Sequence, residues 1–229
     1  MHTYKGVFEA HITIEPLQID AQTKFIAFCA KNNLKPIQIE LSRGDVAFQQ
    51  MTSSIHEGAF EQVLAVVKGI AELLGRQGFG VSRVKLEAAP SNENLPATCA
   101  ELMEHSAENY FEHHLKLSLP TDLAGKLETL LQICETHHAH LSRNAFKQNI
   151  EGFMERFVTV RHYGLGKAEA IEALNALKMA ITVEGLQILK TITEYCVYDD
   201  HVALDANWLI VEPQSPCETC DSACILSPV

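Results

Sequence analysis

Two histidines stand at matching positions in a repeated pattern. His11 lies in the segment FEAHITI, residues 8–14, and His114 lies in FEHHLKL, residues 111–117, which begins 103 residues later. Imidazole titrates near neutral pH and is also a common metal ligand. A matched pair of histidines therefore predicts either a general acid and base that work together or two ligands of one metal ion.

Both segments alternate apolar and polar residues, as a strand with one buried face does. The polar members of the two segments are Glu9, His11 and Thr13, and Glu112, His114 and Lys116.

The sequence His11-Ile12-Thr13-Ile14 resembles the His-x-Thr-x motif of the two-histidine phosphoesterases, which carry one such motif in each lobe of a duplicated α+β fold. The resemblance implies that His11 and His114 act as acid and base on a phosphodiester, while Thr13 holds phosphate oxygens. Lys116 stands where that family has its second Thr, and would hold phosphate as a point charge.

A second resemblance is to the bimodular enzymes of the vicinal-oxygen-chelate type, which take a His from the first strand and a Glu from the last strand of each module. His11 and Glu87 occupy those positions in the first half, and His114 and Glu194 occupy them in the second. Two imidazoles and two carboxylates imply a divalent metal, with iron, manganese, zinc and nickel all suited to the set.

A structural role for both histidines is the alternative to both resemblances. Polar groups buried in a fold are usually paired, so His11 and His114 could be hydrogen-bonded to Glu9, to Glu112 or to a neighbouring strand without any chemistry.

Three cysteines near the end of the sequence form a separate candidate. Cys217, Cys220 and Cys224 have C-x-x-C-x-x-x-C spacing, which offers three thiolates to zinc or to an iron–sulfur centre. The alternatives are a redox-sensitive tail, a disulfide between two of the three, and a modified-peptide precursor whose tail is altered by a separate enzyme. We expect no regular structure in this tail.

The elements that position these residues follow one order twice. In the first half, alternation predicts strands over 7–15, 36–41, 48–55 and 81–88, with helices over 20–30 and 60–74. In the second half it predicts strands over 110–119, 141–146, 153–162 and 189–198, with helices over 123–135 and 167–180. Strand, helix, strand, strand, helix, strand is the ferredoxin-like unit.

The fold prediction is therefore an α+β protein made of two ferredoxin-like units related by a pseudo-two-fold axis. The first lobe would cover residues 1–90, a linker 91–108, the second lobe 109–211 and the Cys-rich tail 212–229. In such a unit the helices cover one sheet face and leave the other open. If the two open faces meet, both polar triplets converge on a cleft between the lobes that would hold a small molecule.

Composition limits which other classes of protein this sequence could belong to. A net charge of −11 argues against sequence-independent nucleic-acid binding, which needs clustered Lys and Arg. No apolar stretch approaches a membrane span, and the first residues lack the apolar run of a signal peptide, so we expect a cytoplasmic protein that does not bind membranes. Four scattered cysteines are expected as buried free thiols: Cys29, Cys99, Cys134 and Cys196.

The sequence thus predicts a small soluble protein with a His-containing cleft, either a phosphoesterase-like or a metal-dependent enzyme acting on a small molecule. The alternative is a non-catalytic binding or scaffold protein, or a modified-peptide precursor, in which the tail is the functional element.

Overall fold

The computed structural model describes residues 3–18, 21–120, 124–144 and 152–208. The protein is a mixed α/β structure with an eight-stranded antiparallel sheet and four α-helices. In the first half the elements are β1 (Lys5–Ile14), α1 (Ala21–Lys31), β2 (Lys35–Leu41), β3 (Phe48–Ala59), α2 (Phe60–Arg76) and β4 (Val81–Ala88).

The second half has the same order of strands and α-helices. Its elements are β5 (Tyr110–Pro120), α3 (Ala124–Thr136), β6 (His140–Asn144), β7 (Phe153–Tyr163), α4 (Lys167–Val183) and β8 (Gln187–Asp199). Two short 3-10 helices complete the set, η1 (Cys99–Glu104) between the halves and η2 (Val202–Asp205) after β8.

The eight strands close into one barrel in the order β1-β3-β2-β6-β7-β5-β8-β4. Each half contributes four adjacent strands, and the halves join where β2 pairs with β6 and where β4 pairs with β8. A sheet that closes on itself leaves no strand edge unpaired, which removes the template for pairing with other chains.

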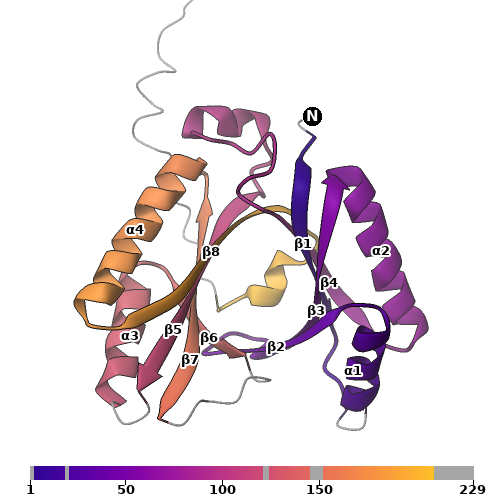
Figure 1. Cartoon of the computed structure of the whole chain (residues 1–229), viewed down its shortest axis with the longest axis horizontal. Coiled ribbons are helices and arrows are strands. Elements are labelled where there is room, and N and C mark those ends of the chain that lie inside the picture. The colour runs from indigo at the N-terminus through magenta and orange to yellow at the C-terminus, as the bar shows by residue number, and fades with distance from the viewer. Residues whose placement is uncertain (1–2, 19–20, 121–123, 145–151, 209–229) are drawn as a thin grey trace, which may run out of the picture.

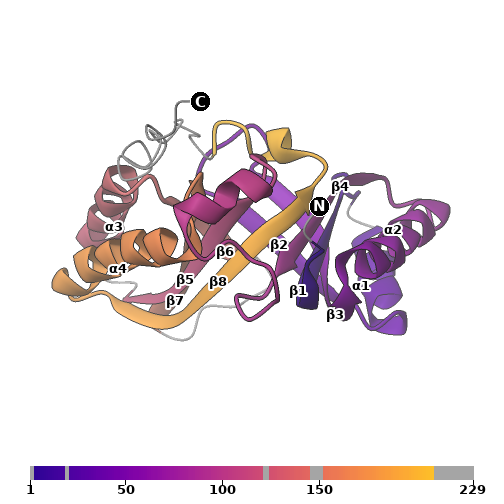
Figure 2. The same ribbon diagram turned by 90° about the horizontal axis from the view of Figure 1, so that it is seen from above.

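All four α-helices lie outside the barrel. Figures 1 and 2 show α1 and α2 against one side of it and α3 and α4 against the opposite side. The apolar faces of the strands point outward to the helices: Phe8, Ala10 and Ile12 of β1 belong to one core cluster with Val67 of α2. Leu115 and Leu117 of β5 belong to a second cluster.

The polar residues of the alternating strands therefore face the interior of the barrel. The expected cleft between two lobes is in fact this enclosed lumen, because the outer strands of the two halves pair instead of staying apart. One end of the lumen is crossed by η2, which Figure 1 shows within the ring of strands.

Several local expectations differ from the structure. β3 continues to Ala59, four residues past the expected end, and the expected linker contains the 3-10 helix η1. Cys29, Cys99, Cys134 and Cys196 are free and buried, as expected. The tail cysteines Cys217, Cys220 and Cys224 lie outside the described residues. Within the described ranges no helix is long and apolar enough to cross a membrane.

Candidate metal centre

The lumen contains a cavity of about 330 Å³, at the lower end of the volumes of small-molecule sites. Residues from the barrel strands line it, together with Asp205 of η2 and Trp208 beyond it. All the candidate residues of the first two predictions face this one cavity: His11, Thr13, Glu87, His114, Lys116 and Glu194.

The strand registers explain how residues so distant in sequence meet. Glu9 of β1 stands opposite Glu87 of β4, and Glu112 of β5 stands opposite Glu194 of β8. The β4–β8 seam then brings the two pairs together, because Glu87 is opposite Cys196, two residues from Glu194. A register shift falls between Leu86 and Glu87, and such irregularities often redirect side chains near functional sites.

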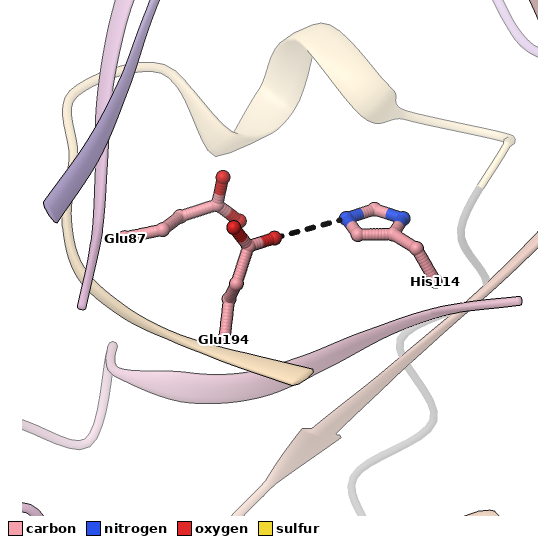
Figure 3. Close-up of side chains that lie close together, drawn as sticks. All are labelled: Glu87, His114 and Glu194. Atoms are coloured by element: carbon pink, nitrogen blue, oxygen red, sulfur yellow. Dashed lines mark ion pairs between the residues drawn. The ribbon is translucent and has the colours of Figure 1, made fainter. Parts of the chain in front are cut away.

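Three side chains gather closely at this seam. One ligand atom each from Glu87, His114 and Glu194 lies within 4.8 Å of the other two. Figure 3 shows the two carboxylates side by side, with the imidazole of His114 directed toward them. The imidazole Nε2 of His114 is 3.6 Å from Glu194 Oε2 and 3.0 Å from Glu112 Oε1.

The orientation of His114 is fixed from its other nitrogen. Nδ1 forms a hydrogen bond of 2.9 Å with Thr159 Oγ1, from the adjacent strand β7. A partner at Nδ1 that leaves Nε2 directed at carboxylates is the arrangement by which proteins orient a metal-binding imidazole.

His11 contacts one carboxylate of this cluster, that of Glu87. Its Nε2 is 3.2 Å from Glu87 Oε2 and 3.6 Å from Glu9 Oε1, while its buried Nδ1 has no hydrogen-bond partner among the described residues. Burial lowers the pKa of His11, but the hydrogen bond and the charge of Glu87 outweigh burial and raise it. His11 therefore neighbours the cluster of three without belonging to it in the present geometry.

One lysine and one arginine offset part of the negative charge. Lys85 Nζ lies 2.6 Å from Glu87 Oε1 and 2.9 Å from Glu112 Oε1, and Arg161 pairs with the other oxygen of Glu112. Burial raises the pKa of Glu87, but the charge of Lys85 together with the hydrogen bond and charge of His11 outweighs burial and lowers the pKa to about 2. Burial likewise raises the pKa of Glu112, and Arg161 and Lys85 hold it well below its usual value.

Among the described residues, neither Lys85 nor Arg161 lies within ion-pair distance of the carboxyl of Glu194. Burial raises its pKa, and the nearby charges of Glu87 and Glu9 raise it further, to about 10. The residue is 8% exposed, and within the described ranges the one basic side chain within ion-pair distance of its carboxyl is the imidazole of His114. A carboxylate in this setting either holds a proton or needs a cation.

A second polar network closes the end of the lumen beneath η2. Asp205 accepts hydrogen bonds from Gln49 Nε2 at 2.9 Å, Arg83 Nη1 at 2.8 Å and Arg161 Nη2 at 2.9 Å. Arg83 also pairs with Asp199 at the end of β8. This network fixes η2 across the barrel and has no open coordination position.

The remaining predicted residues also lie in the lumen. Thr13 is buried, and Lys116 is partly exposed and paired with Glu155 of β7. The sequence analysis missed the interior bases Arg83, Lys85 and Arg161. Their signal was present in β4, where Arg83, Lys85 and Glu87 alternate with Val84, Leu86 and Ala88.

Comparisons with known proteins give little further information. No family model matches the sequence, and no curated protein matches it. Among solved structures, one similar chain is the crystal structure of a provisionally assigned glycine cleavage system transcriptional repressor. It is 10% identical, with 85% of this chain and 99% of that chain covered and a TM-score of 0.27. A similarity this weak carries no argument about function.

Proposed function

We propose that this protein is a metal-dependent enzyme that acts on a small molecule inside its barrel. Glu87, His114 and Glu194 would hold a divalent metal ion, and His11 would move to complete the set. The observation that carries the proposal is the gathering of the first three, whose ligand atoms lie within 4.8 Å of one another in the wall of a cavity.

A second observation supports a cation at this place. Glu9, Glu87, Glu112 and Glu194 line one cavity, whereas Lys85 and Arg161 are the permanently charged bases within ion-pair distance of any of them among the described residues. Four ionised carboxylates against two bases would leave an excess of two negative charges with both histidines neutral, and in the metal-free protein a proton on Glu194 removes one of them. A divalent ion would neutralise that excess without moving the strands.

The donor set suits borderline transition metals. Carboxylate and imidazole ligands together favour zinc, iron, manganese or nickel over calcium and magnesium, which prefer oxygen ligands alone. Such an ion would act as a Lewis acid toward a bound oxygen or lower the pKa of a bound water. Lys85 would hold Glu87 and Glu112 in place beside it.

The phosphoesterase-like alternative is less well supported. Two histidines acting as acid and base need a phosphodiester between them, yet each Nε2 here faces a glutamate, Glu87 for His11 and Glu112 for His114. An anionic phosphodiester at that point would be repelled by the carboxylates unless a cation were also present.

We also propose that the two halves arose by duplication of a ferredoxin-like unit, with lobes at 1–90 and 109–211. The repeated order of elements supports this, and so does the position of the candidate ligands. His11 and His114 lie on the first strand of each half, and Glu87 and Glu194 lie on the last. Duplication would explain why each half supplies one imidazole and one carboxylate.

The experiment is a metal analysis of the full-length protein with matched variants. Wild type should bind one equivalent of metal, and Glu194→Gln, Glu87→Gln and His114→Ala should each lower the affinity by 10-fold or more, on the order seen when a ligand is lost. Glu128→Gln on α3 and His137→Ala at its end are the controls, because neither faces the cavity, and they should bind as wild type does.

A further variant separates the barrel from the tail. Replacing Cys217, Cys220 and Cys224 together by Ser keeps the chain at full length and removes the competing thiolates. Metal that survives this change but is lost in Glu194→Gln belongs to the barrel. If the triple Ser variant loses the metal and Glu194→Gln keeps it, the proposal is wrong and the tail is the metal site.

A further inference from the structure

The cavity has a second polar region away from the carboxylates. Lys35 of β2, Lys116 of β5 and Lys190 of β8 all line it. Lys116 and Lys190 are direct partners in the β5–β8 register, so two like charges face each other on neighbouring strands. Directly opposed like charges destabilise a sheet unless something offsets them.

The acidic residues that the structure describes neutralise only part of the positive charge of these lysines. Lys116 is paired with Glu155 of β7. Lys35 and Lys190 are both exposed, and neither has an ion-pair partner in the part of the chain that the structure describes. Lys190 lies beside the paired Lys116, and Lys35 lines the same cavity from β2, four strands from β8 in the barrel order. In a protein with a net charge of −11, these ammonium groups make the cavity locally favourable for an anion.

The strand geometry sets the distance from this region to the carboxylates. Lys116 follows His114 by two residues on the same face of β5, which is about 7 Å at 3.3 Å per residue. Lys190 precedes Glu194 by four residues on β8, which is about 13 Å. A molecule that spans the two regions is therefore roughly 7–13 Å long.

Part of the cavity wall is apolar. Ile37 and Ile39 of β2, Met51 of β3, Phe157 of β7 and Ile192 of β8 line it. Apolar surface of this kind would contact the middle of a ligand and would not favour a highly hydroxylated one.

We infer that the substrate of the proposed site is a small amphipathic anion, with a carboxylate or phosphate group held by the neighbouring Lys116 and Lys190 and attracted by Lys35 on the opposite wall of the cavity, and with an apolar body between this group and the metal. The inference rests on the proposed function for the metal end alone. The lysine end is a property of the cavity and is tested without metal.

The experiment is calorimetric titration of metal-free, full-length protein at low ionic strength with hexanoate, hexyl phosphate and hexanol. These probes share an apolar chain and differ in their head group, so the two anions distinguish carboxylate from phosphate. We expect at least one anion to bind more tightly than hexanol by five-fold or more, and its affinity to fall as salt is added.

Lysine variants locate the binding. Lys35→Gln and Lys190→Gln should each weaken the preferred anion three-fold or more and leave hexanol unchanged. Lys24→Gln on α1, an exposed lysine outside the cavity, is the control and should have no effect. Since Lys35 and Lys190 are exposed, their replacement should leave the fold intact, which circular dichroism would check.

Two results would overturn the inference. One is anion binding no tighter than that of hexanol, including no binding of either anion up to about 10 mM. The other is a loss of anion affinity in Lys24→Gln that is as large as the loss in the cavity variants. Neither depends on metal, so a protein that binds no metal but retains lysine-dependent anion binding would refute the proposed function and leave this inference standing.

Discussion

The buried carboxyl of Glu194 makes a quantitative prediction about the stability of the metal-free protein. Burial and the charges of Glu87 and Glu9 raise its pKa to about 10, from an ordinary value of 4.5. Between these two pH values the folded protein holds a proton that the unfolded chain releases. Ionisation in the unfolded state therefore favours unfolding increasingly as the pH rises from 4.5 toward 10.

The magnitude follows from the width of that interval. Each pH unit above 4.5 costs about 1.4 kcal/mol of folding free energy, so pH 7, at 2.5 units, corresponds to a cost on the order of 3 kcal/mol. Glu194→Gln keeps the shape of the protonated carboxyl and has no proton to release. The variant should therefore be more stable than metal-free wild type at pH 7, with a midpoint higher by roughly 6–12 °C.

The assay is urea unfolding of both proteins at pH 5, 6, 7 and 8 after removal of metal by a chelator. The stability difference should be about 0.7 kcal/mol at pH 5 and widen by about 1.4 kcal/mol per unit above it. Glu128→Gln, an exposed glutamate on α3, is the matched control and should show no such trend. Other titrating groups are present in both proteins, so they cancel in the difference.

Two outcomes would refute the reasoning about Glu194. A stability difference that stays constant from pH 5 to pH 8 would mean that the carboxyl ionises normally in the folded protein. A variant that becomes less stable than wild type as the pH rises would mean that Glu194 is ionised and paired, so that the amide removes a favourable interaction.

Three further predictions concern the structure around the lumen. Burial lowers the pKa of His162 to about 4. The contribution of His162 to the free energy of unfolding should therefore be fully present above pH 6.5 and be lost as the pH drops toward 4. His162→Phe should reduce this loss of stability between pH 6.5 and 4 in unfolding experiments. Asp205→Asn should cost about 3–5 kcal/mol, measured by urea unfolding, because it leaves Arg83 and Arg161 buried without their shared carboxylate. Gly166→Ala should lower the thermal midpoint by several degrees, because a Cβ there would meet the backbone that precedes η1, whereas the open position Gly125→Ala should not.

The order of the elements could be predicted from the sequence because each element has its own periodic signal. β1 and β5 alternate in a regular way, and the apolar positions of α2 recur at helical spacing. These are local patterns, and they depend only on which face of an element is buried. The closure of the barrel has no such signal, because the pairing of β2 with β6 and of β4 with β8 depends on how both halves twist and meet.

The candidate residues could be predicted for a similar reason, and their contacts could not. Alternation of apolar and polar residues places His11 on the polar face of β1 and His114 on the polar face of β5. Both polar faces point into the barrel, so both histidines line the same cavity. The separation of the two histidines by Glu87, Glu194 and Lys85 depends on strand register, which a one-residue slip would reverse. Register across the β4–β8 seam is set by pairing over a sequence distance of about 110 residues, and no single segment encodes it.

The position of the carboxylates at a seam links the proposed metal site to the fold itself. The two halves are joined by short ladders, four residue pairs at β4–β8 and three at β2–β6. Within the halves the β1–β3 and β5–β7 ladders have ten and eleven pairs, although β6–β7 has only three. Glu87 and Glu194 come from the two sides of the β4–β8 seam, so ionising both without a cation would separate the halves, and in the metal-free protein the proton on Glu194 avoids this repulsion. A cation that binds both carboxylates would instead hold β4 to β8. A ligand that binds only the closed barrel stabilises the closed barrel by the free energy of its binding. In variants at this position, a loss of metal affinity should therefore remove the stabilisation that metal gives to the seam, whatever the variant does to the stability of the metal-free protein.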